Sequence, residues 1–294
     1  MIDAALESLL DALLYEGYAL YPYTDTAAKN ATPTPFGIVY PPAYTHGSRA
    51  AFDMLRLHGI VQGGADVRLE AEVRLLQAAP EGGHRAVERR LPALSGSLAE
   101  LASASRVQTF DLDGLTGRMR LSTRQLVPDL WRVAMCVHNT TAVVAQDLDR
   151  AAALRRSLLS THPIVRVHGG RFASPLERGG VLGHAVEGCE SLNTFPVLAT
   201  PQDDVLVGAT IALPDHPELA PESRGSLFDG TEIEEALLLH VMALSDGERE
   251  QVAGGDPALR EMVERAAAAT PEDLVRLHGR TVVSDPHPPE GRPR

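Results

Sequence analysis

The densest group of residues that could do acid–base or metal chemistry lies in the second half of the chain. Asp215 and His216 are adjacent, and Glu222 and Asp229 follow soon after. A carboxylate beside an imidazole can exchange protons with a substrate, and carboxylate oxygens bind hard cations. The spacing differs from that of an EF-hand calcium loop. Asp229 could equally cap a following helix whose positive end Glu232 complements, so a structural role stays open.

Histidine and cysteine side chains form a second set of candidates. Cys136 and His138 are two residues apart in an expected strand, so both would lie on one face. Two ligands do not complete a metal site, and this one would need His162 or Cys189 as well. Cys189 could be a nucleophile if His162 or His184 lowered its pKa. The alternative is that both cysteines are small buried side chains without chemistry.

The sequence lacks the common catalytic and cofactor motifs. It contains no His-Glu-x-x-His, Cys-x-x-Cys, Gly-x-Ser-x-Gly, Walker or Gly-x-Gly-x-x-Gly pattern. We therefore predict no cofactor and lean against an enzyme. A bound nickel, iron or zinc ion is the alternative, with His162, Asp215 and His216 as its candidate ligands.

Tyrosines are concentrated near the N-terminus. All six fall between Tyr15 and Tyr44. Phenols combine an apolar ring with a polar tip, which suits a ligand pocket or a partner-facing surface, although the rings could also cover an open end of a β core. Lys29, the only lysine, lies in the same window and with Asp25 and Asn30 could bind an anion, or it could be an ordinary surface residue.

Composition limits the class of protein. The 294 residues carry 27 basic and 39 acidic side chains, a net charge of −12, and the pI is near 5.4. Binding to nucleic acid or to anionic membranes needs clustered cationic surface, so we predict neither partner. Two cysteines and the lack of a basic-then-apolar leader predict a reduced, cytoplasmic protein. No apolar stretch approaches the roughly 20 residues of a membrane span.

Hydrophobic periodicity indicates the elements that must position these residues. Leucines at helical spacing predict a helix over residues 2–14, and strict alternation predicts a half-buried strand over residues 67–75. Turn signals separate further expected strands. These strands are residues 36–40, 84–91, 107–111, 115–126 and 131–139. The N-terminal half is thus expected to be mainly an antiparallel β-sheet or open barrel.

The pattern changes near residue 146. We expect helices over residues 147–159 and 176–189, with strands over 163–167, 195–198 and 204–213 between and after them. A helix over residues 231–244 and further helices follow. The predicted fold class is α+β, with a mixed α/β and then helical C-terminal half. We expect a β-rich domain 1–145, an α+β domain 146–280 and a disordered tail 281–294, or else one continuous domain 1–280.

Short blocks spread over nearly the whole chain resemble an uncharacterised bacterial, largely actinobacterial, protein family that is associated with nickel–iron hydrogenase gene clusters. The blocks are LYEGY (14–18), LYPY (20–23), KN (29–30), FG (36–37), YP (40–41), SLLSTH (157–162), TFPVL (194–198), APES (220–223) and LFDGTEI (227–233). His216 and the Cys136–His138 pair depart from the family pattern. Partner- or ligand-binding residues are therefore expected inside the blocks. They are Tyr15, Tyr18, Tyr21, Tyr23, Lys29, Asn30, Glu222, Asp229 and Glu232.

The resemblance implies an accessory or assembly protein that binds a hydrogenase subunit or maturation partner and has no catalysis of its own. Two alternatives stay open from the residues. One is a metal-assisted hydrolase or other small-molecule enzyme that uses Asp215, His216, Glu222 and Asp229. The other is a homodimer with the tyrosines at its interface, since two-fold dimers are the commonest oligomers.

Overall fold

The computed structural model describes residues 4–19, 37–46, 51–79, 86–144, 148–217 and 264. The expected helix over residues 231–244, the tail 281–294 and most of the tyrosine window lie outside these residues. Within the described helices, none is both long enough and apolar enough to cross a membrane.

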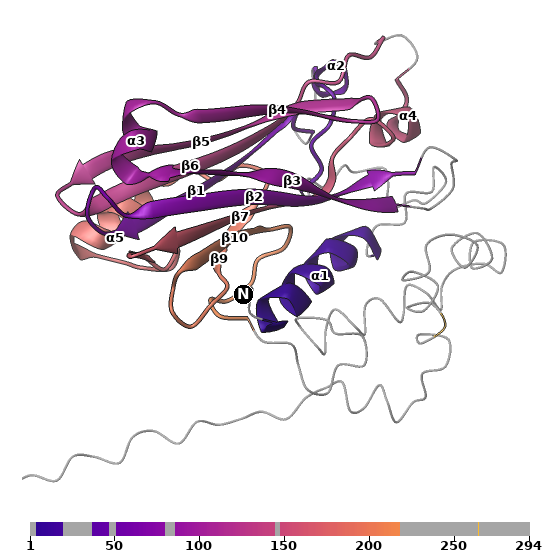
Figure 1. The fold of residues 1–294 in the computed structure, drawn as a ribbon. Coiled ribbons are helices and arrows are strands. Elements are labelled where there is room, and N and C mark those ends of the chain that lie inside the picture. The colour runs from indigo at the N-terminus through magenta and orange to yellow at the C-terminus, as the bar shows by residue number, and fades with distance from the viewer. Residues whose placement is uncertain are drawn as a thin grey trace, which may run out of the picture.

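The described strands form two five-stranded antiparallel sheets that lie one above the other (Figure 1). The first sheet has the order β4 (Arg106–Leu112), β5 (Leu115–Val127), β6 (Leu130–Asn139), β1 (Met54–Gln62) and β8 (Arg171–Phe172). The second has the order β3 (Ala86–Ser97), β2 (Arg68–Ala78), β7 (Leu159–His168), β10 (Val205–Ala209) and β9 (Phe195–Leu198). The prediction of mainly antiparallel β structure in the N-terminal half is confirmed, and the described part of the chain as a whole is mainly antiparallel β.

Alternating side chains place the main hydrophobic core between the two sheets. In β6, Trp131, Val133, Met135 and Val137 are all buried, whereas the residues between them are partly exposed. Leucines and valines of β1, β2, β5 and β7 join the same cluster. Because successive side chains of a strand point to opposite faces, each sheet keeps a second, outer face.

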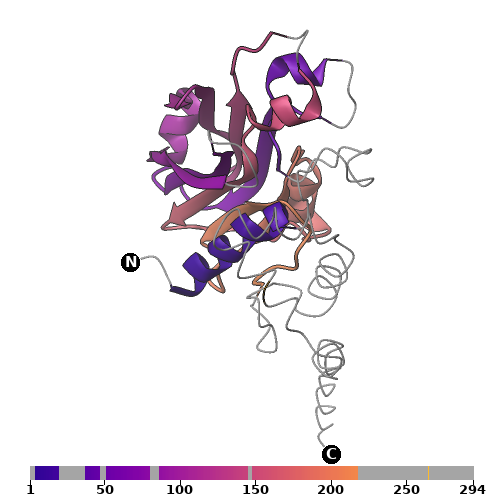
Figure 2. The ribbon, with the colours of Figure 1, turned by 90° about the vertical axis from the view of Figure 1, so that its right-hand side faces the viewer.

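Helices cover these outer faces to different extents. α1 (Ala4–Ala19) lies along the second sheet (Figures 1 and 2), and its buried leucines pack against β7, β9 and β10. α5 (Gly180–Glu187) packs at one end of the first sheet, against Ile60 and Leu130. The remaining helices are short: α2 (Pro42–Thr45), α3 (Leu98–Ser103) and α4 (Arg150–Leu154). α3 begins with a capping box between Ser97 and Glu100, which satisfies amides at the helix start.

Three of the expected elements differ in the structure. The helix over residues 147–159 is reduced to α4, because Leu158 bonds to Val39 and Leu159 begins β7. The helix over residues 176–189 begins only at Gly180, because Gly179 and Gly180 both have positive φ. The strand over residues 36–40 is a single bridge at Val39, since Pro41 and Pro42 start α2 instead.

The second half of the chain contributes strands to both sheets. β7 pairs with β2 along most of its length, and β8 pairs with β1. The expected mixed α/β arrangement between residues 146 and 217 is therefore corrected to antiparallel strands with two short helices. Backbone pairing with β2 stabilises this segment as strand, and such tertiary pairing routinely overrides local helix propensity.

Candidate functional site

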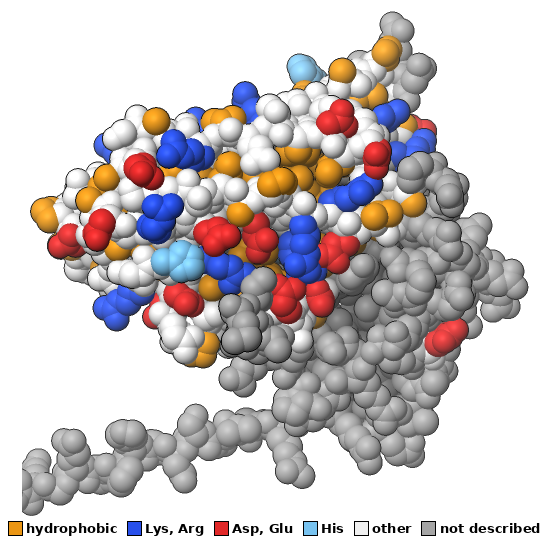
Figure 3. Space-filling view, viewed as in Figure 1, with side chains coloured by type: hydrophobic (Ala, Val, Ile, Leu, Met, Phe, Trp, Pro, Cys, Tyr) orange, Lys and Arg blue, Asp and Glu red, His pale blue; other side chains and the backbone are white. Residues whose placement is uncertain are grey.

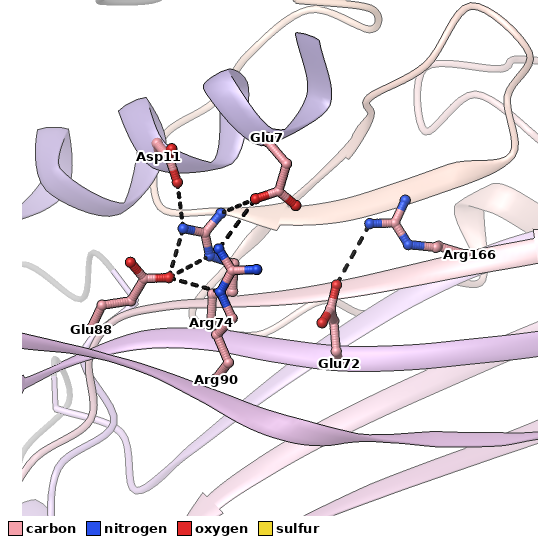
Figure 4. Close-up of polar contacts among 7 residues, drawn as sticks. All are labelled: Glu7, Asp11, Glu72, Arg74, Glu88, Arg90 and Arg166. Carbon is pink, nitrogen blue, oxygen red and sulfur yellow. Dashed lines mark hydrogen bonds and ion pairs between the residues drawn. The ribbon is translucent and has the colours of Figure 1, made fainter. Parts of the chain in front are cut away.

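A buried arginine of the second sheet gathers acidic side chains from α1 and β3 (Figure 4). Arg74 is only 1% exposed. Its Nη2 donates to Asp11 Oδ1 and, at 2.7 Å, to Glu88 Oε1. Glu7 Oε2 lies 3.6 Å from Arg74 Nη1 and 3.2 Å from Arg90 Nη2. Glu7 and Asp11 are one helical turn apart, so α1 presents both carboxylates to the same guanidinium.

This ionic cluster fastens α1 to the sheet. A buried cation needs carboxylate partners and hydrogen bonds to offset its lost hydration, and Arg74 has three carboxylates. Acidic and basic side chains also alternate farther along this face (Figure 3), where Arg166 lies 3.6 Å from Glu72. The ion pairs of Arg74, Arg90 and Arg166 thus hold elements of the second sheet and α1 together.

His162 lies beneath α1 and makes two hydrogen bonds. Its Nδ1 donates to the Gly208 carbonyl oxygen over 3.0 Å, because a carbonyl can only accept. Its Nε2 therefore carries a lone pair and accepts from Ser160 Oγ at 3.1 Å. Burial lowers the pKa of His162 from 6.5 to about 4. The ring is neutral at physiological pH.

A neutral histidine that accepts from a serine hydroxyl has the form of a base and its nucleophile. Ser160 also has a positive φ of 44°, which is uncommon for this residue type. Both side chains are at most 1% exposed, however, so a substrate cannot reach them with α1 in place. In this arrangement both nitrogens of His162 are occupied, and the pair joins β7 to the Gly208 carbonyl of β10.

Asp215 and His216 hold the chain that follows β10. Asp215 Oδ1 accepts from the Leu198 amide at 3.1 Å, and its Oδ2 accepts from Ser174 Oγ at 2.5 Å. His216 lies 2.7 Å from Asp203 through Nε2. The two side chains thus contact different partners, and both are separate from the buried His162 pair.

The structure does not bring the metal candidates together. Among the described residues, no group of three or more His, Cys, Asp or Glu side chains could hold a metal ion. Glu222, Asp229 and Glu232 lie outside the described residues, as do Tyr21, Tyr23, Lys29 and Asn30. Tyr15 and Tyr18 fall within α1, but their side chains are also outside the description.

One pair from the tyrosine window is described. Tyr40 and Tyr44 stack with ring centroids 4.8 Å apart. Tyr40 is fully buried and belongs to a small cluster with Leu76 and Leu159 at one end of the sheets. For this pair, covering the end of the core is the role that the contacts support.

Sequence reasoning missed a row of arginines on the outer face of the first sheet. Arg118, Arg120 and Arg124 alternate in β5 with buried Met119, Leu121 and Thr123. All three arginines are exposed. The alternation was visible in the sequence. We call this surface the arginine face and define it by these three residues and their outward-facing neighbours on β4 and β6.

A second set of basic side chains holds the α5 segment against this sheet. Arg132 donates to the Gly188 carbonyl oxygen at 2.8 Å, and Arg56 lies 3.3 Å from Glu190. The Glu190 amide donates to His58 Nδ1. Burial and the nearby Arg56 and Arg132 lower the pKa of His58 from 6.5 to about 4. These arginines have structural partners, unlike the row in β5.

We predict that neither cysteine reacts readily with alkylating agents. Burial raises the pKa of Cys189 to about 11 and also raises the pKa of Cys136, despite Arg120 and Arg56 beside the latter. Because the thiolate is the reactive form, iodoacetamide at about pH 7.5 should modify both thiols well below the rate of free cysteine. Mass spectrometry of timed samples measures the rate. Rapid modification of Cys189 in the folded protein would instead support a nucleophile.

Comparison with known proteins assigns no family to this arrangement. No protein-family model matches the chain, and no curated protein is similar to it.

Proposed function

We propose that this protein is a cytoplasmic accessory factor that binds a hydrogenase subunit or maturation partner and does no catalysis of its own. The blocks shared with the hydrogenase-associated family support the class of partner. The contacts of the described polar clusters support a binding role. Arg74, His162, Asp215 and His216 are all engaged in joining elements of the fold.

The observation that carries the proposal is the unequal covering of the two sheets. α1 packs on the outer face of the second sheet, whereas in the described part of the chain α5 and the segment after it cover the first sheet near Ile60, Leu130 and Arg56. Much of the remaining outer face of β4, β5 and β6 is exposed or partly exposed. A rigid antiparallel sheet with one solvated face offers a preformed surface, so a partner can dock at little conformational cost.

Affinity purification of the tagged full chain from its own host tests the proposal. We expect a hydrogenase subunit or maturation protein to co-purify after mild cross-linking, and a tag-only control to lack it. Elemental analysis and light scattering are run on the same sample. Stoichiometric nickel, iron or zinc without a polypeptide partner would contradict the proposal in favour of a metal site, and a pure homodimer would contradict it in favour of self-association.

A further inference from the structure

The strand register places the arginine face as a regular array. Arg118 lies opposite Thr109 of β4 and His138 of β6, and Arg120 lies opposite Val107 and Cys136. Arg124 lies opposite Arg132. Directly opposite residues are about 5 Å apart, and alternate residues along a strand are about 7 Å apart. The guanidinium groups therefore stand close enough for one partner segment to contact all three.

Within the part of the chain that the structure describes, the three arginines of β5 form a row without ion pairs, whereas six other arginines have acidic partners. Ion pairs join Arg89 to Asp113, Arg106 to Glu100 and Arg166 to Glu72. Within the described ranges, no ion pair is formed by Arg118, Arg120 or Arg124. In a chain with a net charge of −12, a row of unpaired cations on one face is a marked departure from the average surface.

The positive charge of the β5 arginines affects the pKa of a nearby histidine. Burial lowers the pKa of His138, and Arg118 and Arg120 lower it further, while Asp53 acts in the opposite direction. Glu190 is already paired with Arg56, and Asp111 accepts from the Gly114 amide at the end of β4. The carboxylates of Asp53 and Asp111 form no ion pair among the described residues, but Arg118, Arg120, Arg124 and Arg132 outnumber them, so this face has a positive balance.

The composition of the face favours a protein over a nucleic acid. Sheets that bind single-stranded nucleic acid stack bases on exposed aromatic rings. Here the aromatic side chains of β4 and β6, Phe110 and Trp131, pack in or against the core. Val107, which is 56% exposed beside Arg120, instead offers an aliphatic contact. The guanidinium group of arginine forms two parallel hydrogen bonds with a carboxylate. The arginine face can therefore recognise carboxylate groups.

We infer that the arginine face binds an acidic segment of a partner protein, with Arg118, Arg120 and Arg124 pairing with its Asp and Glu carboxylates. This inference deepens the proposed function, because it rests on the partner being a protein and names the chemistry that recognises it. Apolar contacts at Val107 and the small side chains of Ser122 and Ala134 let a segment approach the sheet closely. Binding of this kind weakens as ionic strength rises.

Fluorescence anisotropy with a labelled oligoglutamate peptide tests the inference on the full chain. We expect binding at low ionic strength that weakens as salt is added, and none to an oligoglutamine peptide of equal length. Arg120→Glu should weaken binding about tenfold, and the variant with Arg118→Glu, Arg120→Glu and Arg124→Glu should abolish it. Arg68→Glu is the matched control, because Arg68 is an exposed strand arginine of the second sheet. It should change the affinity less than twofold.

Replacing all three arginines by lysine separates geometry from charge. We expect a clear loss of affinity for oligoglutamate, because lysine keeps the charge but not the fork. Equal effects of Arg68→Glu and Arg120→Glu would overturn the inference, as would tighter binding of an oligothymidylate than of oligoglutamate. A hydrogenase protein captured equally well by wild type and the triple glutamate variant would overturn the acidic-segment inference but leave the proposed function standing. Oligoglutamate binding without any captured hydrogenase protein would overturn the proposed function but leave the acidic-segment inference standing.

Discussion

Replacing Arg74 by methionine is expected to lower the free energy of unfolding by about 3 kcal/mol. Methionine fills a similar volume but leaves Glu7, Asp11 and Glu88 facing one another without the guanidinium between them. These carboxylates are partly exposed and can regain some hydration, so the cost falls at the lower end of that for a broken buried ion pair. Urea unfolding followed by circular dichroism measures the loss.

Arg90→Met is the matched control for this prediction. Arg90 pairs with Glu7 and Glu88 as well, but its side chain is 47% exposed. Exposed ion pairs contribute little, so this variant should lose less than about 1 kcal/mol. Amide hydrogen exchange should show that Arg74→Met weakens protection of α1 more than that of β6. Equal stabilities of the two variants would show that the ionic cluster does not fasten α1.

Acidification is expected to destabilise the protein through His162 by about 3 kcal/mol. The unfolded chain binds a proton at this residue near pH 6.5, whereas the folded protein binds it only at about pH 4. Between these values the proton stabilises the unfolded state alone, at about 1.4 kcal/mol for each unit of pKa difference. The stability that the neutral His162 contributes is fully present above pH 6.5, falls as the pH is lowered and is lost near pH 4.

His162→Asn isolates this contribution. Its amide can still donate to the Gly208 carbonyl oxygen but does not titrate. The stability difference between wild type and this variant should therefore shrink by about 3 kcal/mol from neutral pH to pH 4 in urea titrations. A constant difference for His162→Asn would contradict the assigned neutral ring.

The strands with clean alternation could be predicted from the sequence, and the others could not. Polar and apolar residues alternate from Arg68 to Leu75 in β2, and the position of this strand was predicted to within a few residues. Leu55 and Leu57 alternate with Arg56 and His58 in β1, yet Gly59 and the apolar run after it interrupt the pattern, and this strand was missed. The predicted helix over residues 147–159 continued past α4 into the start of β7. Pairing with β2 makes that segment a strand, and β2 is distant from it in sequence.

The polar clusters depend even more on distant contacts. Arg74 contacts Asp11 and Glu88 because α1 and β3 both lie beside β2. The spacing of residues in the sequence does not predict these contacts. His162 was a candidate metal ligand in the alternative to a metal-free protein, but its partners Ser160 and the Gly208 carbonyl are fixed by strand pairing. The alternating arginines of β5 were visible in the sequence, whereas the absence of ion pairs to them within the described residues could be seen only in the folded sheet.

Arginine footprinting in the presence of the captured partner tests the central claim most directly. The full chain is treated with a phenylglyoxal reagent, alone and in the co-purified complex, and the modified peptides are quantified by mass spectrometry. We expect the partner to protect Arg118, Arg120 and Arg124, while the exposed Arg68 of the second sheet is modified equally in both samples. Unchanged modification of the three β5 arginines, or protection of Arg68 instead, would contradict this claim.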